Sequence, residues 1–272
     1  MFQVVFANTV TKLGPECAEQ VLIGASHCGK YAAYLAAKAQ ARAVILHDAG
    51  IGKDDAAVAG LQFLDELRVP AAATAHFSAR IGDAKDIARR GTVSRVNANA
   101  ARLGCRPGHP VLVCAELMQA AEVRRYGVPP YGEARFVISA NAGEPQVWGV
   151  DSISLVVPED AGRIMVGASH GGLLDGKISL SADALAVFCN DAGVGIEQAG
   201  IAQLSRLDER NIVGIAVAAS SARIGSARSA YDDGIVSYVN EAALRLGVEA
   251  GSSVKDAVRN IIRSATQGGN EA

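Results

Sequence analysis

The sequence predicts an α/β protein built from two tandem units of similar sequence, in which mainly parallel sheets are covered by helices. Residues 1–111 align with residues 144–254 at a constant offset of 143 without a gap, and 43 of the 111 aligned pairs are identical. Short apolar runs without alternation are separated by segments of helical periodicity, which is typical of parallel sheets buried on both faces. A repeat of this length is one supersecondary unit present twice. We therefore expect two βαβαβα units that arose by internal duplication and pack as a pseudo-twofold pair.

Three buried strands are expected in the first unit, each marked by a run of small or branched apolar residues. The first run is 21–25, the second is 43–46, and the third extends from Ala71 to Phe77. Because right-handed crossovers connect parallel strands, their carboxyl ends should all lie along one edge of the sheet. In the second unit the corresponding strands are expected at 164–166, 186–189 and 212–219.

Three helices are expected between and after these strands. Residues 30–41 are rich in Ala, residues 54–67 carry Val and Leu at intervals of three or four, and residues 86–103 follow the third strand. Apolar residues at this spacing form one face of an amphipathic helix. Gly104 is suited to end the last of these helices, since glycine readily adopts the left-handed conformation found at helix ends.

Further strands are expected outside the repeated core. The stretches 3–12 and 146–155 alternate in polarity, and we expect each to add an antiparallel strand at a sheet edge. Residues 135–139 are expected to form a strand that leads into the second unit. The predicted organisation is a first unit at 1–129, a connector at 130–143 and a second unit at 144–272.

Composition and charge argue against several classes of protein. The net charge of −2 and the lack of a Lys/Arg cluster argue against nucleic-acid binding. No uncharged run approaches the roughly 18 apolar residues of a membrane span, and the start lacks the pattern of a signal peptide. The five cysteines are an odd number without CxxC spacing, which fits a reducing compartment. We therefore expect a cytoplasmic protein that binds neither membrane nor nucleic acid.

Polar residues that are identical in both copies follow the predicted strands. Ser26-His27 follows the first strand, Asp48-Ala49-Gly50 the second, and Ser78-Ala79-Arg80-Ile81-Gly82 the third. In open parallel sheets ligands bind outside the carboxyl ends of the strands, so these loops should converge on one crevice. Glycines there let backbone amides approach a ligand, and arginine suits a carboxylate or phosphate. A small anionic metabolite is therefore the expected ligand.

These residues suggest a hydrolase that acts on an amide, ester or lactam bearing a carboxylate. His27 would be the general base, Asp48 would orient it, and Ser78 or Ser26 would be the nucleophile. Neither a dinucleotide fingerprint nor a Walker motif follows any strand, so no cofactor is expected, and no metal site is assigned. The expected substrate-binding residues are Arg80, Gly50, Gly52, Gly82, Ser169, His170, Asp191, Ser221 and Arg223.

A second function remains open at the same loops, namely a non-catalytic binding protein or partner subunit for an anionic metabolite. Under that hypothesis Arg80 and Arg223 hold the anion. As purely structural alternatives, Ser26 caps a helix, Asp48 stabilises a turn, and Arg80 pairs with Asp48 or Asp83. The sequence also leaves open a homo-oligomer, and either one composite site or two separate ones. His76 is interpreted as a core or interface residue. The copies differ at His47, Lys53, His76 and Asp83, which are Asn190, Ile196, Ala219 and Ser226 in the second copy.

Overall fold

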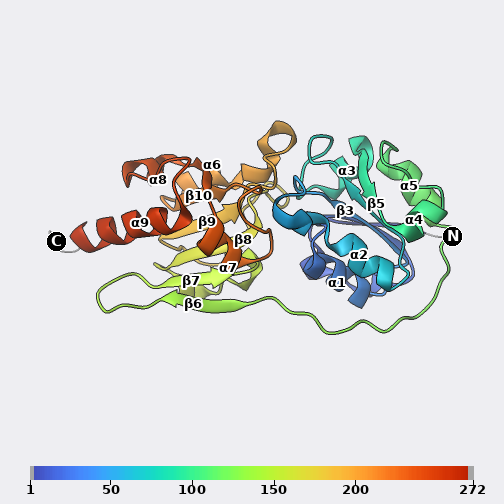
Figure 1. The fold of residues 1–272 in the computed structure, drawn as a ribbon, viewed down its shortest axis with the longest axis horizontal. Coiled ribbons are helices and arrows are strands. Elements are labelled where there is room, and N and C mark those ends of the chain that lie inside the picture. Colours follow the sequence, from blue (N-terminus) through green and yellow to red (C-terminus); the bar gives the residue numbers. More distant parts are fainter. Residues whose placement is uncertain (1–2, 269–272) are drawn as a thin grey trace. The chain divides into compact units, whose positions relative to one another are not determined.

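The computed structural model describes residues 3–268, which divide into two compact units. Unit 1 contains residues 3–51, 55–132 and 193–199, and unit 2 contains residues 52–54, 133–192 and 200–268. Each unit is a mainly parallel sheet flanked by helices (Figure 1), so the predicted α/β class is confirmed.

Five strands form the sheet of unit 1 in the order β1-β2-β3-β4-β5. Strands β1 to β4 are parallel, and β5 is antiparallel to β4. The predicted strand near residues 3–12 is present as β1 at the sheet edge, but its expected antiparallel direction is wrong because it pairs with β2 in parallel. The strands are β1 (Val4–Ala7), β2 (Val21–His27), β3 (Ala43–His47), β4 (Ala71–Thr74) and β5 (Val93–Val96).

Helices cover both faces of this sheet (Figure 1). One face packs against α1 mainly through its alanines and against α2 through its leucines and Phe63, and the other packs against α3 and α5. The alanine-rich sequence of α1 favours a helix and lets it approach the sheet closely. The helices are α1 (Lys30–Lys38), α2 (Gly60–Glu66), α3 (Ala84–Arg90), α4 (Ala98–Arg102) and α5 (Val111–Met118).

The single helix expected over residues 86–103 is wrong, since two short helices flank β5 there. Helix α3 ends at Gly91, where a Cβ would lie 2.3 Å from the carbonyl oxygen of Ile87. Asn97 then caps α4, because its side chain accepts a hydrogen bond from the amide of Ala100. The same side chain also accepts from the amide of Ala71 and donates to the carbonyl of Val69, which ties α4 to the start of β4.

Six strands form the sheet of unit 2 in the order β11-β10-β9-β8-β7-β6. The strand predicted at 135–139 is confirmed as β6, which pairs with β7 antiparallel. Strand β7 lies inside the sheet and is parallel to β8, so the expected antiparallel edge strand at 146–155 is wrong. The strands are β6 (Arg135–Ser139), β7 (Val147–Val150), β8 (Ile164–His170), β9 (Ala186–Asn190), β10 (Val213–Val217) and β11 (Val236–Val239).

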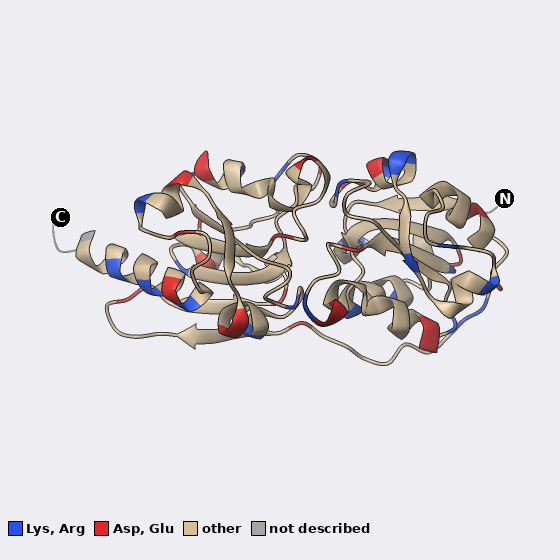
Figure 2. Cartoon of the chain, turned by 45° about the horizontal axis from the view of Figure 1, so that its top comes forward, with Lys and Arg blue, Asp and Glu red and all other residues tan. Residues whose placement is uncertain are grey.

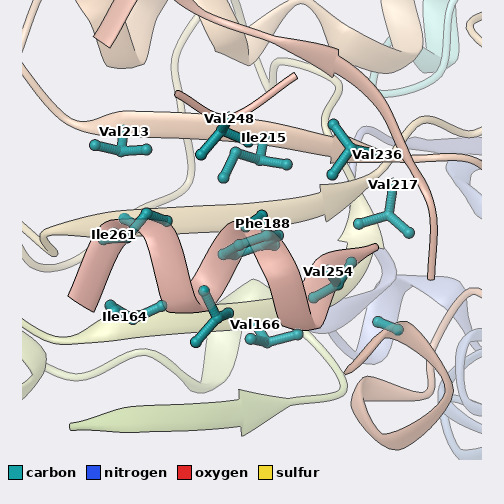
Figure 3. Close-up of a cluster of buried hydrophobic side chains, with 14 of the residues drawn as sticks. Ile164, Val166, Phe188, Val213, Ile215, Val217, Val236, Val248, Val254 and Ile261 are labelled. Carbon is teal, nitrogen blue, oxygen red and sulfur yellow. The ribbon is translucent and has the colours of Figure 1, made fainter. Parts of the chain in front are cut away.

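The largest hydrophobic cluster of unit 2 lies between its sheet and α9 (Figure 3). Val254 and Ile261 of this helix lie over strand residues that include Val166 and Phe188. Leu207 of α6 contributes to a second cluster with Met165 and Val187. The helices are α6 (Gln203–Asp208), α7 (Ala227–Asp233), α8 (Glu241–Arg245) and α9 (Val254–Gly268).

The two copies correspond element by element at the offset of 143, as two similar units should, but they differ in three places. Helix α1 has no counterpart, since the equivalent residues 173–181 form a loop with one isolated bridge. Strand β6 occurs only in unit 2, and α5 ends at Met118 where α9 continues to Gly268. Short 3-10 helices occur at Val10–Lys12, Pro15–Cys17, Lys53–Val58, Ile153–Leu155, Pro158–Asp160 and Ile196–Ile201.

Candidate functional site

The repeated Asp-Ala-Gly segment builds a left-handed turn at the end of β3. Residues 49–52 all have positive φ, from 44° at Ala49 to 76° at Gly50. The turn is closed by hydrogen bonds from the amide of Gly50 to the Asp48 side chain and from that of Ile51 to the Asp48 carbonyl. A left-handed conformation costs about 1–2 kcal/mol for each residue other than glycine. Gly50 and Gly52 therefore reduce the conformational cost of this turn, and residues 192–195 repeat it in the second copy.

Asp48 is buried and binds His76 rather than His27. Its Oδ1 accepts hydrogen bonds from the amide of His76 at 2.9 Å and from the ring Nδ1 of His76 at 3.0 Å. Burial alone would raise the pKa of Asp48, but the hydrogen bonds from His76 and Ser94 together with the nearby imidazole of His47 outweigh it, and the pKa lies below its usual value. His76 contributes an imidazole to this site, although its position within the predicted third strand favoured a core or interface role.

His27 lies at the end of β2 with its ring held as a hydrogen-bond acceptor. Its Nδ1 accepts from the amide of Gly29 at 3.1 Å. Burial, together with the neighbouring His47, lowers the pKa of His27 to about 4. A neutral ring whose Nδ1 accepts carries its proton on Nε2, so neither nitrogen is free to accept a proton from a nucleophile. His170 accepts the equivalent hydrogen bond from the amide of Gly172.

The two candidate nucleophiles brace the backbone. The hydroxyl of Ser78 donates to the carbonyl of Ala75 at 2.8 Å and accepts from the amide of Thr92 at 2.9 Å. The hydroxyl of Ser26 accepts from the amide of Val10 at 3.1 Å. In the second copy Ser221 donates to Ala218 and accepts from Ile235, and Ser169 accepts from Ile153.

Arg80 belongs to a network of ion pairs in unit 1. Its guanidinium lies 3.4 Å from Asp86 and 3.4 Å from Glu197, which belongs to the same unit. Asp86 is buried and also binds Arg89 and Arg90. Burial would raise the pKa of Asp86, but hydrogen bonds from the backbone amide and guanidinium of Arg80, and from Arg89 and Arg90, hold it well below its usual range. Arg80 therefore pairs with two carboxylates, neither of which is the Asp48 or Asp83 expected from the sequence.

The remaining predicted residues lie in the corresponding loops. Gly82 has a φ of 84° and its amide donates to the carbonyl of Ala25, which fixes the loop after β4 to the end of β2. Asp191 accepts a hydrogen bond from the amide of Ala219 at 2.9 Å, which repeats the backbone part of the Asp48 arrangement. Arg223 forms an ion pair with Asp54 at 2.6 Å within unit 2.

A cavity lies at the opposite edge of the unit 1 sheet, beside the amino-terminal ends of β3 and β4. Its volume is about 260 Å³, and four of its lining side chains are arginines with a single carboxylate, that of Glu122. We call it the arginine pocket. The lining residues are Arg42, Arg68, Val69, Pro70, Asn99, Arg102, Leu103, Ala120, Ala121, Glu122, Arg124 and Tyr126.

The segment that follows α5 closes this pocket. Arg42 donates from Nε to the carbonyl of Ala121 at 2.7 Å, and Arg124 donates to the carbonyl of Leu67. The hydroxyl of Tyr126 donates to the carbonyl of Ala41 at 2.7 Å, and the guanidinium of Arg124 lies over its ring. These bonds hold residues 121–126 against the sheet edge and orient two of the four guanidinium groups.

Charge is concentrated in the arginine pocket. Along the backbone, positively and negatively charged residues both occur in each unit (Figure 2). In unit 1, ion pairs join Arg80, Arg89 and Arg90 to Asp86, and Arg125 to Glu19, at positions outside the pocket lining. Four guanidinium groups and one carboxylate give the lining a formal charge of +3.

The sequence pattern alone did not single out these arginines. They are separated by 20 or more residues along the chain, and composition shows no basic cluster. A signal was present in the comparison of the copies, since Arg42 aligns with Leu185 and Arg68 with Asn211.

Comparisons with protein-family models, with curated proteins and with solved structures find no match for this chain. Within residues 3–268, no helix combines the length and apolar character that a membrane crossing requires. Over the same range, no three His, Cys, Asp or Glu side chains are grouped so that they could hold a metal ion.

Proposed function

We propose that this protein binds an anionic small molecule in the arginine pocket, which corresponds to the second of the two functions expected from the sequence. The observation that carries the proposal is the gathering of four guanidinium groups and one carboxylate around a cavity of about 260 Å³. Arginine remains charged at every physiological pH, so the like charges repel one another until an anion binds between them. The expected ligand is still a small anionic metabolite, but the proposed site lies at the amino edge of the unit 1 sheet instead of the carboxyl edge.

The backbone at Arg68 also supports binding rather than stability as the role of this residue. Arg68 has a φ of 56°, and the aligned Asn211 has a φ of 57° in the same turn. Asparagine adopts this left-handed conformation more readily than arginine does. The first copy therefore has the residue less suited to the turn at a position that lines the pocket. A ligand contact explains that choice.

Calorimetric titration with a panel of small organic anions and their neutral analogues tests the proposal. The wild-type chain should bind anions only, and binding should weaken as salt is added because the attraction is electrostatic. Arg42→Leu and Arg68→Asn, which introduce the residues of the second copy, should each weaken binding at least about tenfold. Arg206→Leu, at an exposed position of α6 in unit 2, is the matched control and should leave binding unchanged. Equal affinity for neutral analogues would contradict the proposal.

One observation keeps the hydrolase as a second candidate, namely the hydrogen bond between Asp48 and His76. If Nδ1 of His76 donates its proton to the carboxylate, Nε2 becomes an acceptor that can take a proton from water. We propose His76 in place of His27 as the base of that hydrolase, with water in place of Ser78 as nucleophile. A screen of esters, amides and lactams tests this candidate. Turnover should be lost in His76→Ala and retained in His27→Gln; the opposite order would restore the original assignment.

A further inference from the structure

We infer that the arginine pocket takes a phosphate monoester whose organic part is apolar and about the size of a single ring. This inference rests on the proposed function, since it names the class of ligand for that pocket. It is carried by three properties of the lining: its charge, the origin of its donors and the presence of one apolar wall.

The charge of the lining favours a doubly charged anion. Four guanidinium groups oppose one carboxylate, so a monocarboxylate would leave a formal charge of +2 in the occupied pocket. A phosphate monoester brings close to two negative charges at neutral pH and three acceptor oxygens. It therefore compensates more of the charge and accepts more hydrogen bonds than a carboxylate.

The donors come from four separate segments of unit 1. Arg42 precedes β3, Arg68 precedes β4, Arg102 ends α4, and Arg124 follows α5. A planar carboxylate offers two oxygens to one or two of these groups, whereas the tetrahedral phosphate presents oxygens in three directions. Convergence from several segments thus matches the shape of a phosphate better than that of a carboxylate.

The pocket also has room and a surface for an organic group. Its volume of about 260 Å³ is several times the ~30 Å³ that a water molecule occupies in the liquid, so an inorganic ion alone would leave it largely unfilled. Val69, Pro70 and Leu103 form an apolar part of the lining, and Tyr126 adds an aromatic side chain. Such a wall stabilises an apolar ring by removing it from water.

Titration calorimetry with four probes tests this inference: phenyl phosphate, phenylacetate, inorganic phosphate and phenol. Phenyl phosphate should bind at least about tenfold more tightly than each of the other three. Its affinity should fall between pH 7.5 and pH 5, because a phosphate monoester loses its second charge near pH 6. Phenyl sulfate, which keeps one charge over this range, is the control and should change little. Arg68→Asn should remove most of the preference for phenyl phosphate over phenylacetate.

Each failure has its own meaning. If phenylacetate binds as tightly as phenyl phosphate, the phosphate inference is wrong while anion binding stands. If inorganic phosphate binds as tightly as phenyl phosphate, the apolar wall has no role and the inference is again wrong. If none of the three anions binds, both the inference and the proposed function are overturned.

Discussion

The two edges of the unit 1 sheet differ in how they compare with the second copy. At the carboxyl edge, Ser26 and Ser78 make the same backbone hydrogen bonds as Ser169 and Ser221. At the amino edge, by contrast, Arg42 and Arg68 align with Leu185 and Asn211 in the second copy, while Arg102 aligns with an arginine, Arg245. At the carboxyl edge, identity between the copies therefore marks side chains that hold the backbone, and at the amino edge Arg42 and Arg68 are the pocket arginines specific to the first copy.

This distinction changes how the repeated motifs are interpreted. A Ser-His, an Asp and a Ser-Ala-Arg at successive strand ends resemble parts of a catalytic site when read as sequence. In the structure each of the two serines satisfies a backbone group, and Arg80 is paired with carboxylates. The exception at this edge is His76, because Ala219 occupies its position in the second copy.

The largest expected effect is on stability, and it should differ between the repeated aspartates Asp48 and Asp191. Asp48→Ala removes a buried acceptor from two amides and one imidazole, and we expect the free energy of unfolding to fall by about 3–5 kcal/mol. Asp191→Ala should lower the free energy of unfolding by less, since the second copy has Ala219 where the first has His76. Denaturant unfolding of both variants measures the difference. Equal losses would show that the bond to His76 adds nothing to stability.

A second test concerns pH. His27 has a folded-state pKa of about 4 against an ordinary value of 6.5, so the unfolded chain binds more protons between these two values. Stability should therefore decrease as pH falls from about 6.5 to 4, by about 2–3 kcal/mol from this group. His27→Gln should flatten that part of the curve of unfolding free energy against pH. An unchanged slope would mean that His27 does not titrate differently in the folded state.

The serines provide a matched pair for the carboxyl edge. Ser78→Ala and Ser221→Ala each remove one donated and one accepted backbone hydrogen bond. We expect each to lower the free energy of unfolding by about 1–2 kcal/mol. Thermal and denaturant unfolding test this equality. If Ser78→Ala left stability unchanged while Ser221→Ala lowered it, Ser78 would have a role other than bracing.

Much of the fold follows from local sequence. The runs at 21–25 and 43–46 are apolar enough to predict buried strands, and they lie in β2 and β3, respectively. Strand β5 was missed because its four residues, Val93-Ser94-Arg95-Val96, are too short to show a period distinct from the helices around them. The loss of α1 from the second copy has a trace in sequence, since residues 31–40 and 174–183 share a single identity.

The site was harder to predict than the fold because its members are brought together by tertiary structure. Arg42 and Arg124 are 82 positions apart, and they meet because α5 ends at Met118 and the chain turns back over the sheet edge. No local sequence pattern predicts that reversal of the chain. The partner of Asp48 was missed for a related reason, since the hydrogen bond between its carboxylate and Nδ1 of His76 joins the loops after β3 and β4, and no sequence motif connects these two residues.

The smallest expected effect on stability is also the one that best isolates function. Arg68→Asn places at a φ of 56° the residue that the second copy has at 57°, and it removes one of four like charges. Without ligand we expect the free energy of unfolding to rise by a few tenths to about 1 kcal/mol. With phenyl phosphate present the order should reverse, because a ligand at a given concentration stabilises a protein more when it binds more tightly. Melting temperatures with and without the probe measure both effects. A variant that is less stable in both conditions would show that Arg68 holds the fold, and the distinction between the two edges would then fail at its clearest position.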